Sequence, residues 1–249
     1  MRALARIGFV ISGAGGFALF ASAEPPWNVD DPGVTSRGVL TLYDSVQIAS
    51  GPTGRTVNWP SFAATFGATD RLEIGLGFTA LTSSGPALIR GVEWSDLGIS
   101  VKRLMVGSPE DPRLAAAVQA TFPLGNGSSS SHSQSAWIAG HGAAGANRLT
   151  WNVGGTVGGR DRLASAFYGI VVDRPIDGRS VAGVELSGST AEFRGERQRL
   201  EVGVGYQRDA LPNVNVQARF GTSVVRPGEW TVFIGLTFDV DVRSRAVGR

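Results

Sequence analysis

The chain lacks cysteine altogether and contains one lysine, Lys102, and two histidines among 249 residues. Without cysteine no disulfide can form, and zinc sites built from nitrogen and sulfur ligands are strongly disfavoured, so we expect no metal and no cofactor. Charged residues make up only 18%, whereas soluble domains typically carry roughly 25%. The 23 basic and 21 acidic residues nearly balance, which argues against a nucleic-acid partner.

The N-terminal apolar run is too short to span a membrane as a helix. It extends from Ile7 to Phe20, about 14 residues, against the roughly 20 that a spanning helix needs. Arg2 and Arg6 precede it and Ala21-Ser22-Ala23 follows. This layout predicts a secretory signal peptide over residues 1–23, cleaved after residue 23. An uncleaved anchor or a buried strand is the alternative.

The mature part alternates between apolar and polar or small residues. In the clearest stretch, Leu72, Ile74, Leu76 and Phe78 alternate with Glu73, Gly75, Gly77 and Thr79. A period of two predicts a strand with one apolar face. Reading every such stretch, we expect twelve strands, near residues 37–49, 56–67, 71–82, 93–105, 112–124, 134–145, 147–158, 163–173, 179–189, 199–208, 213–224 and 229–239.

These strands predict an all-β protein, a single antiparallel transmembrane β-barrel over residues 37–240. The second face of the strands is rich in Gly, Ser, Thr, Asn and Gln, which suits a lumen, while the apolar face suits lipid. We expect a periplasmic lead at 24–36 and a C-terminal tail at 241–249. A soluble periplasmic β-sandwich is the rival architecture. Asp44 shares a face with Leu42 and Val46, which indicates a bulge or a register error nearby.

Several short motifs resemble a known family. They are the Pro- and Asp-rich lead Pro25–Pro32, Asp96-Leu97-Gly98 with Val101-Lys102, Phe122-Pro123-Leu124-Gly125-Asn126, and Ile234-Gly235-Leu236-Thr237-Phe238. Together they resemble the outer-membrane barrel family labelled as transporters of the meta-pathway of phenol degradation. The resemblance implies a Gram-negative outer-membrane channel for passive passage of small molecules, aromatic or apolar ones included. Its partners would be outer-membrane lipid, the permeant and the barrel-assembly machinery. The segment Asp239–Arg249 departs from the aromatic ending usual in such barrels.

A small set of charges falls on the polar faces of the expected strands. Charges inside a membrane barrel belong in the lumen, where water or opposite charges solvate them. They form either a charge-lined constriction that selects permeants or ion pairs that fill a closed interior, and Lys102 is expected near Glu73. The predicted lumen-lining residues are Glu73, Asp96, Lys102, Glu185, Glu201 and Arg219.

An enzymatic function is the less favoured alternative. His132 follows a serine run at an expected outer loop, so a lipid or ester hydrolase could use it with a serine such as Ser130. A nucleophilic serine needs a base held in place by a third group, and a flexible serine-rich loop does not preorganise one. His141 is expected to be structural or lumen-facing. We therefore expect no enzyme, with a closed structural barrel as the third possibility.

Overall fold

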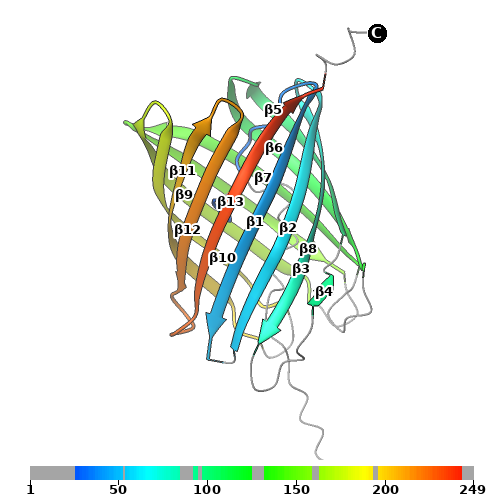
Figure 1. Cartoon of the computed structure of the whole chain (residues 1–249), viewed down its shortest axis with the longest axis vertical. Coiled ribbons are helices and arrows are strands. Elements are labelled where there is room, and N and C mark those ends of the chain that lie inside the picture. Colours follow the sequence, from blue (N-terminus) through cyan, green and yellow to red (C-terminus); the bar gives the residue numbers. More distant parts are fainter. Residues whose placement is uncertain are drawn as a thin grey trace, which may run out of the picture.

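The computed structural model describes residues 26–52, 54–84, 92–94, 97–124, 132–158, 163–192 and 196–242. The predicted signal peptide, Asp96, Ser130 and residues 243–249 of the tail lie outside these residues. The described residues form strands and no helix (Figure 1). None of them belongs to a helix that is long and apolar enough to cross a membrane.

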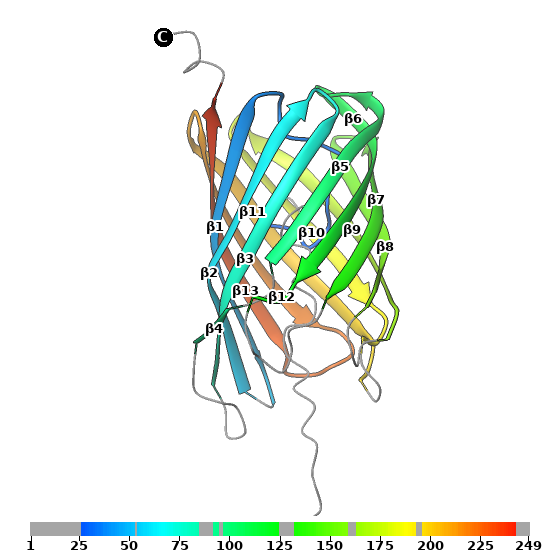
Figure 2. The same cartoon turned by 90° about the vertical axis from the view of Figure 1, so that its right-hand side faces the viewer.

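Twelve long antiparallel strands close into a barrel, as predicted. Each strand pairs with its neighbours in sequence, β1 pairs with β13, and the pairings of β2 with β3 and of β3 with β5 complete the ring (Figures 1 and 2). A closed ring leaves no strand edge without a partner. The strands are β1 Val39–Gly51, β2 Gly54–Thr69, β3 Leu72–Ser84, β5 Leu97–Ser108, β6 Asp111–Phe122, β7 Ser133–Ala144, β8 Asn147–Val157, β9 Ser165–Asp177, β10 Ser180–Ser189, β11 Arg199–Leu211, β12 Val214–Ser223 and β13 Trp230–Asp241.

The strand expected at 93–105 is present in two pieces. β4, Val92–Trp94, pairs antiparallel with the last part of β3, and β5 pairs antiparallel with its first part. Both pieces therefore run in the same direction along one edge of β3, and the register shifts by one residue between them. Alternation in the sequence did not indicate this interruption.

The two faces of the wall have opposite character. On β3, Ile74 and Leu76 are 45% and 42% exposed on the outside, whereas Glu73, which precedes Ile74, is 5% exposed. On β5, Val101 is exposed and Lys102 is buried. Apolar side chains thus face outward and polar ones inward, the arrangement of a barrel surrounded by lipid.

Asp44 is the exception that the sequence analysis noted. It is exposed and pairs in register with Leu236 on β13 and Phe62 on β2, both on the outer face. The register between β1 and β2 shifts just beyond it, between Ser45 and Gln47. The irregularity is therefore where we expected it, yet Asp44 stays on the apolar face because the shift begins one residue later.

The two ends of the barrel differ in their connections. At one end, which we call the turn side, neighbouring strands are joined by tight turns, such as Gly145–Ala146 between β7 and β8, where Gly145 has a φ of 65°. Glycine adopts this left-handed conformation without steric cost. β13 ends on this side, at the top of Figure 1. The opposite end, the loop side, carries the longer connections.

The segment before β1, residues 26–36, lies inside the barrel, and we call it the lead. The chain reverses direction at the turn side, where the Gly38 amide donates to the Gly67 carbonyl at 2.8 Å and the Val39 amide donates to the Ser36 carbonyl at 2.9 Å. In its described part, Trp27, Val29 and Asp30 are buried against the inner wall. The expected bounds of the lead, 24–36, and its periplasmic location stay a prediction.

Candidate functional site in the barrel lumen

Two inner-wall glycines make room for the lead. A Cβ atom on Gly205 of β11 would lie 2.5 Å from the Trp27 ring, and one on Gly169 of β9 would collide with Val29. Any other residue at these positions would therefore push the lead away from the wall. The abundance of glycine on the inner face is explained in part by this packing.

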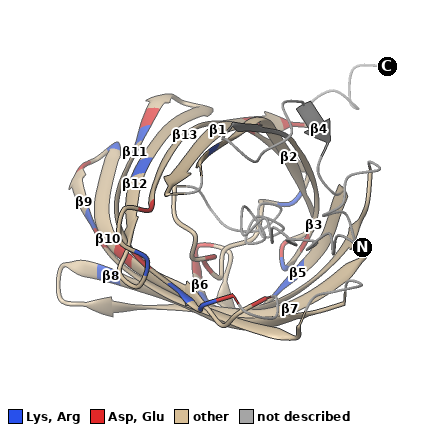
Figure 3. Ribbon diagram, turned by 90° about the horizontal axis from the view of Figure 1, so that it is seen from below, with Lys and Arg blue, Asp and Glu red and all other residues tan. Residues whose placement is uncertain are grey.

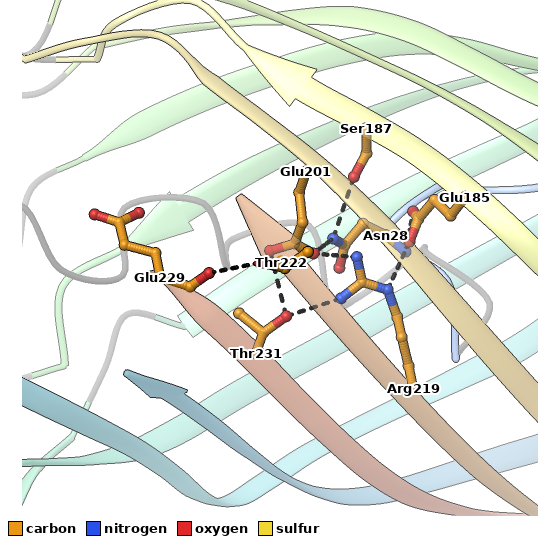
Figure 4. Close-up of polar contacts among 8 residues, drawn as sticks. All are labelled: Asn28, Glu185, Ser187, Glu201, Arg219, Thr222, Glu229 and Thr231. Atoms are coloured by element: carbon orange, nitrogen blue, oxygen red, sulfur yellow. Dashed lines mark hydrogen bonds and ion pairs between the residues drawn. The ribbon is translucent and has the colours of Figure 1, made fainter. Parts of the chain in front are cut away.

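Arg219 is the centre of the first cluster of polar contacts, on the inner face of β12 (Figure 4). Its Nε donates to Glu185 Oε2 of β10 at 2.6 Å, and its Nη1 donates to Thr231 Oγ1 of β13 at 3.2 Å. Its Nη2 contacts Glu201 Oε1 of β11. The Arg219 side chain is 1% exposed, and Gly203 beside it leaves the space that the guanidinium fills. Arg219 is thus fixed by its neighbours β11 and β13 and by β10 beyond β11.

The lead joins this cluster through Asn28. Its backbone amide donates to Glu185 Oε1 at 2.7 Å, and its Nδ2 lies 3.4 Å from Ser187 Oγ and 3.4 Å from Glu201 Oε1 (Figure 4). Glu185 therefore accepts from Arg219 with one oxygen and from the lead with the other. We call Asn28, Glu185, Ser187, Glu201, Arg219 and Thr231 the Arg219 cluster.

Lys102 is the centre of the second cluster. Its Nζ donates to Asp30 Oδ1 of the lead at 2.8 Å and lies 4.0 Å from Asp31 Oδ1. The other oxygen of Asp30 accepts from Trp137 Nε1 of β7 at 2.7 Å. Asp30, Lys102 and Trp137 are each at most 4% exposed. This carboxylate therefore links two strands through the lead.

Glu73 stands beside Lys102 in the wall. The two residues are register partners on β3 and β5, the adjacency that we expected. Glu73 Oε2 accepts from the backbone amide and the hydroxyl of Thr35, at 2.7 and 2.8 Å. The ion pair expected between Glu73 and Lys102 is replaced by one with Asp30, because the lead brings that carboxylate to Nζ. We call Asp30, Asp31, Thr35, Glu73, Lys102 and Trp137 the Lys102 cluster.

Five of the six predicted lumen residues lie on the inner face. Glu73, Lys102, Glu185 and Arg219 are buried and Glu201 is half-buried, in two clusters that each contact the lead. Figure 3 shows that acidic and basic positions occur on many strands around the ring. Whether they line a permeation path stays a prediction. The sequence analysis missed the lead residues, since a segment without a partner strand shows no alternation. The only indication in the sequence was the row of glycines on the inner face, which leave room for the lead.

The two histidines considered for hydrolysis and metal binding lie at opposite ends of the described barrel, and Ser130 lies outside the described residues. His132 is exposed on the loop side, with its ring centroid 5.8 Å from that of Phe122. His141 lies 3.8 Å from Asp111 Oδ1 near the turn side. Within the described part of the chain, no group of three or more His, Cys, Asp or Glu residues could hold a metal ion.

Charged groups also connect the long loops on the loop side. Glu196, 3% exposed, accepts from Arg199 Nη2 at 3.1 Å and from Arg226 Nη2 at 3.2 Å. Burial alone would raise the pKa of Glu196, but these two guanidinium groups outweigh burial and hold it below the ordinary value. The connection between β10 and β11 is thereby held to the one between β12 and β13.

No protein-family model and no curated protein sequence matches the chain. Among solved structures, it resembles an outer membrane channel from Pseudomonas putida F1, with a TM-score of 0.69, 13% identity, and coverage of 84% of this chain and 98% of that one. It also resembles the KdgM porin in complex with disordered oligogalacturonate, with a TM-score of 0.56, 7% identity, and coverage of 80% of this chain and 98% of that one. A third similar structure is the translocator domain of the autotransporter NalP from Neisseria meningitidis, with a TM-score of 0.50, 11% identity, and coverage of 82% of this chain and 89% of that one. At such identities the similarity shows the fold, which is that of the outer-membrane β-barrels.

Proposed function

We propose that this chain is an outer-membrane channel that lets small molecules pass passively, exported by a cleavable signal peptide over residues 1–23. The observation that carries the proposal is the division of the wall into an apolar outer face and a polar, charged inner face, seen on β3 and β5. A barrel whose interior is polar can hold water and solutes. The similarity in fold to a channel and a porin supports it.

The family resemblance suggests aromatic or apolar permeants, and we retain them as the proposed class. The described histidines are not placed in a catalytic arrangement, so we propose no enzymatic activity. Replacing His132 by Ala tests this point. An ester or lipid hydrolysis activity that depends on His132 would contradict it.

A closed structural barrel is the second candidate, because the lead crosses the lumen between the Arg219 and Lys102 clusters. Recordings in planar bilayers distinguish the two candidates, with the full chain compared with a variant that lacks residues 26–36. A channel gives discrete conductance steps for the full chain. If neither protein conducts, the barrel is not a channel. If only the deletion variant conducts, the native barrel is closed by its lead.

A further inference from the structure

Two exposed arginines lie close together on the wall of the barrel, near its turn side. Arg174 belongs to β9 and Arg208 to β11, and β10 lies between these two strands. In register, Ala182 of β10 pairs with Arg174 on one side and with Tyr206 of β11 on the other. Neighbouring strands are about 4.8 Å apart, so the backbones of Arg174 and Tyr206 are about 10 Å apart. Only the small side chain of Ala182 stands between them in this row.

The arginines face outward, beside an apolar part of the outer face. Val172, Val184 and Val204 are register partners across β9, β10 and β11, and all three are exposed. Each lies two residues from a member of the row that contains Arg174, and alternate residues of a strand share a face. Arg174 and Arg208 each lie three residues before the end of their strand at the turn side. They are therefore at the depth where a lipid headgroup meets the acyl chains.

The polar contacts of this group leave guanidinium donors available. The Tyr206 hydroxyl lies 3.1 Å from Ser180 Oγ and shares a side-chain hydrogen bond with Arg208. Asp177, at the exposed end of β9, also interacts electrostatically with Arg208. Within the described residues, no side-chain hydrogen bond or ion pair involves Arg174. A guanidinium has five N–H donors, so both arginines can donate to a ligand placed between them.

We propose that Arg174, Tyr206 and Arg208 bind the phosphate of a membrane phospholipid whose acyl chains lie against the neighbouring valines. Guanidinium groups bind phosphate through charge-assisted hydrogen bonds, and a planar guanidinium suits phosphate geometry. Both arginine side chains are long enough to converge above Ala182. The ligand thus combines one anionic group for the arginines with an apolar part for the row of valines.

The position of the site at the turn side identifies the kind of lipid. Short turns face the periplasm in outer-membrane barrels, and longer loops face outward. The lipid is therefore a glycerophospholipid of the periplasmic leaflet and not lipopolysaccharide. This inference goes beyond the channel proposal, because the site is on the outer face of the wall and does not require the lumen to conduct.

Native mass spectrometry of the full chain in detergent tests the proposal by measuring the fraction of protein that carries phosphatidylglycerol. Diacylglycerol with the same acyl chains is the ligand without phosphate, and phosphatidylglycerol should bind about 10-fold more tightly than it. Arg174→Gln and Arg208→Gln should each weaken the binding of phosphatidylglycerol by about 3- to 10-fold. Arg103→Gln is the control, because Arg103 is exposed on β5 with Leu72 and Ala116 as register partners. It removes the same charge elsewhere on the wall and should leave binding unchanged.

Three results would overturn the site. They are equal binding of the two lipids, unchanged binding of phosphatidylglycerol in Arg174→Gln or Arg208→Gln, and a loss of the same size in Arg103→Gln, which would mean that surface charge alone attracts the lipid. Tighter binding of lipid A than of phosphatidylglycerol overturns the assignment to a phospholipid of the periplasmic leaflet. If one glutamine variant does not assemble, the other and the comparison with diacylglycerol decide. A chain that binds phosphatidylglycerol as expected but does not conduct would overturn the channel proposal alone.

Discussion

Removal of the Asp30 carboxylate should release the lead from the inner wall. In Asp30→Ala, Lys102 Nζ loses its acceptor at 2.8 Å, with Asp31 Oδ1 remaining at 4.0 Å, and Trp137 Nε1 loses its acceptor at 2.7 Å. Breaking a buried ion pair from one side costs about 3 to 5 kcal/mol. Movement of Asp31 toward Lys102 and access of lumenal water reduce this to about 2 to 3 kcal/mol. The population of the released lead should therefore rise about 30- to 150-fold.

The absence of cysteine allows a direct assay of this release. Val29, 1% exposed, is replaced by Cys as the only thiol, and its rate of maleimide labelling is measured with and without Asp30→Ala. The rate should rise by the same 30- to 150-fold factor. Ser36→Cys, at an exposed position of the lead, is the control and should label equally in both backgrounds. Equal labelling of Val29→Cys in the two backgrounds would refute the role of Asp30 in holding the lead.

Three further changes test other parts of the structure. Gly205→Leu should displace Trp27, whose ring lies 2.5 Å from a Cβ at that position, and accelerate the same labelling, whereas Gly142→Leu, with open space around it, should not. Val101→Arg puts a charge on the lipid-facing side and should cost about 2 to 4 kcal/mol of stability in urea titrations in vesicles; an unchanged midpoint would show that the face is misassigned. The pKa of Glu196 is lowered from its ordinary value of 4.5. Its ion pairs therefore contribute to folding stability, by less than about 1 kcal/mol, at pH values above 4.5, and this contribution is lost as the pH falls through the lowered pKa. Glu196→Gln should therefore be less stable than the wild type at neutral pH and equal to it in acid.

The fold followed from local patterns in the sequence. Ile74 beside Glu73 and Val101 beside Lys102 show which face of a strand is apolar, and such pairs recur often enough along the chain to count the strands. A strand in a barrel contacts its neighbours in sequence, so the parity of each residue determines its side of the wall. For this reason Glu73 and Lys102 could be expected side by side before the register was known.

The lead could not be placed by the same reasoning. Asp30 contacts Lys102 across 72 positions of sequence and Asn28 contacts Glu185 across 157, and no periodic pattern connects such distant residues. The counter-ion of Lys102 was therefore assigned to the neighbouring strand. Asp44 shows a second limit, because a single exposed carboxylate on the apolar face breaks the alternation without indicating its orientation.

The position of the lead connects parts of the barrel that are far apart in the sequence. Asn28 bonds to Glu185 of β10 and lies near Glu201 of β11, 157 and 173 residues later in the chain, while Thr35 bonds to Glu73 of β3. The lead therefore has its complete set of native contacts only when β11, the tenth of the twelve long strands, is in place. Once docked, it braces opposite sides of a wall whose strands otherwise contact only their neighbours.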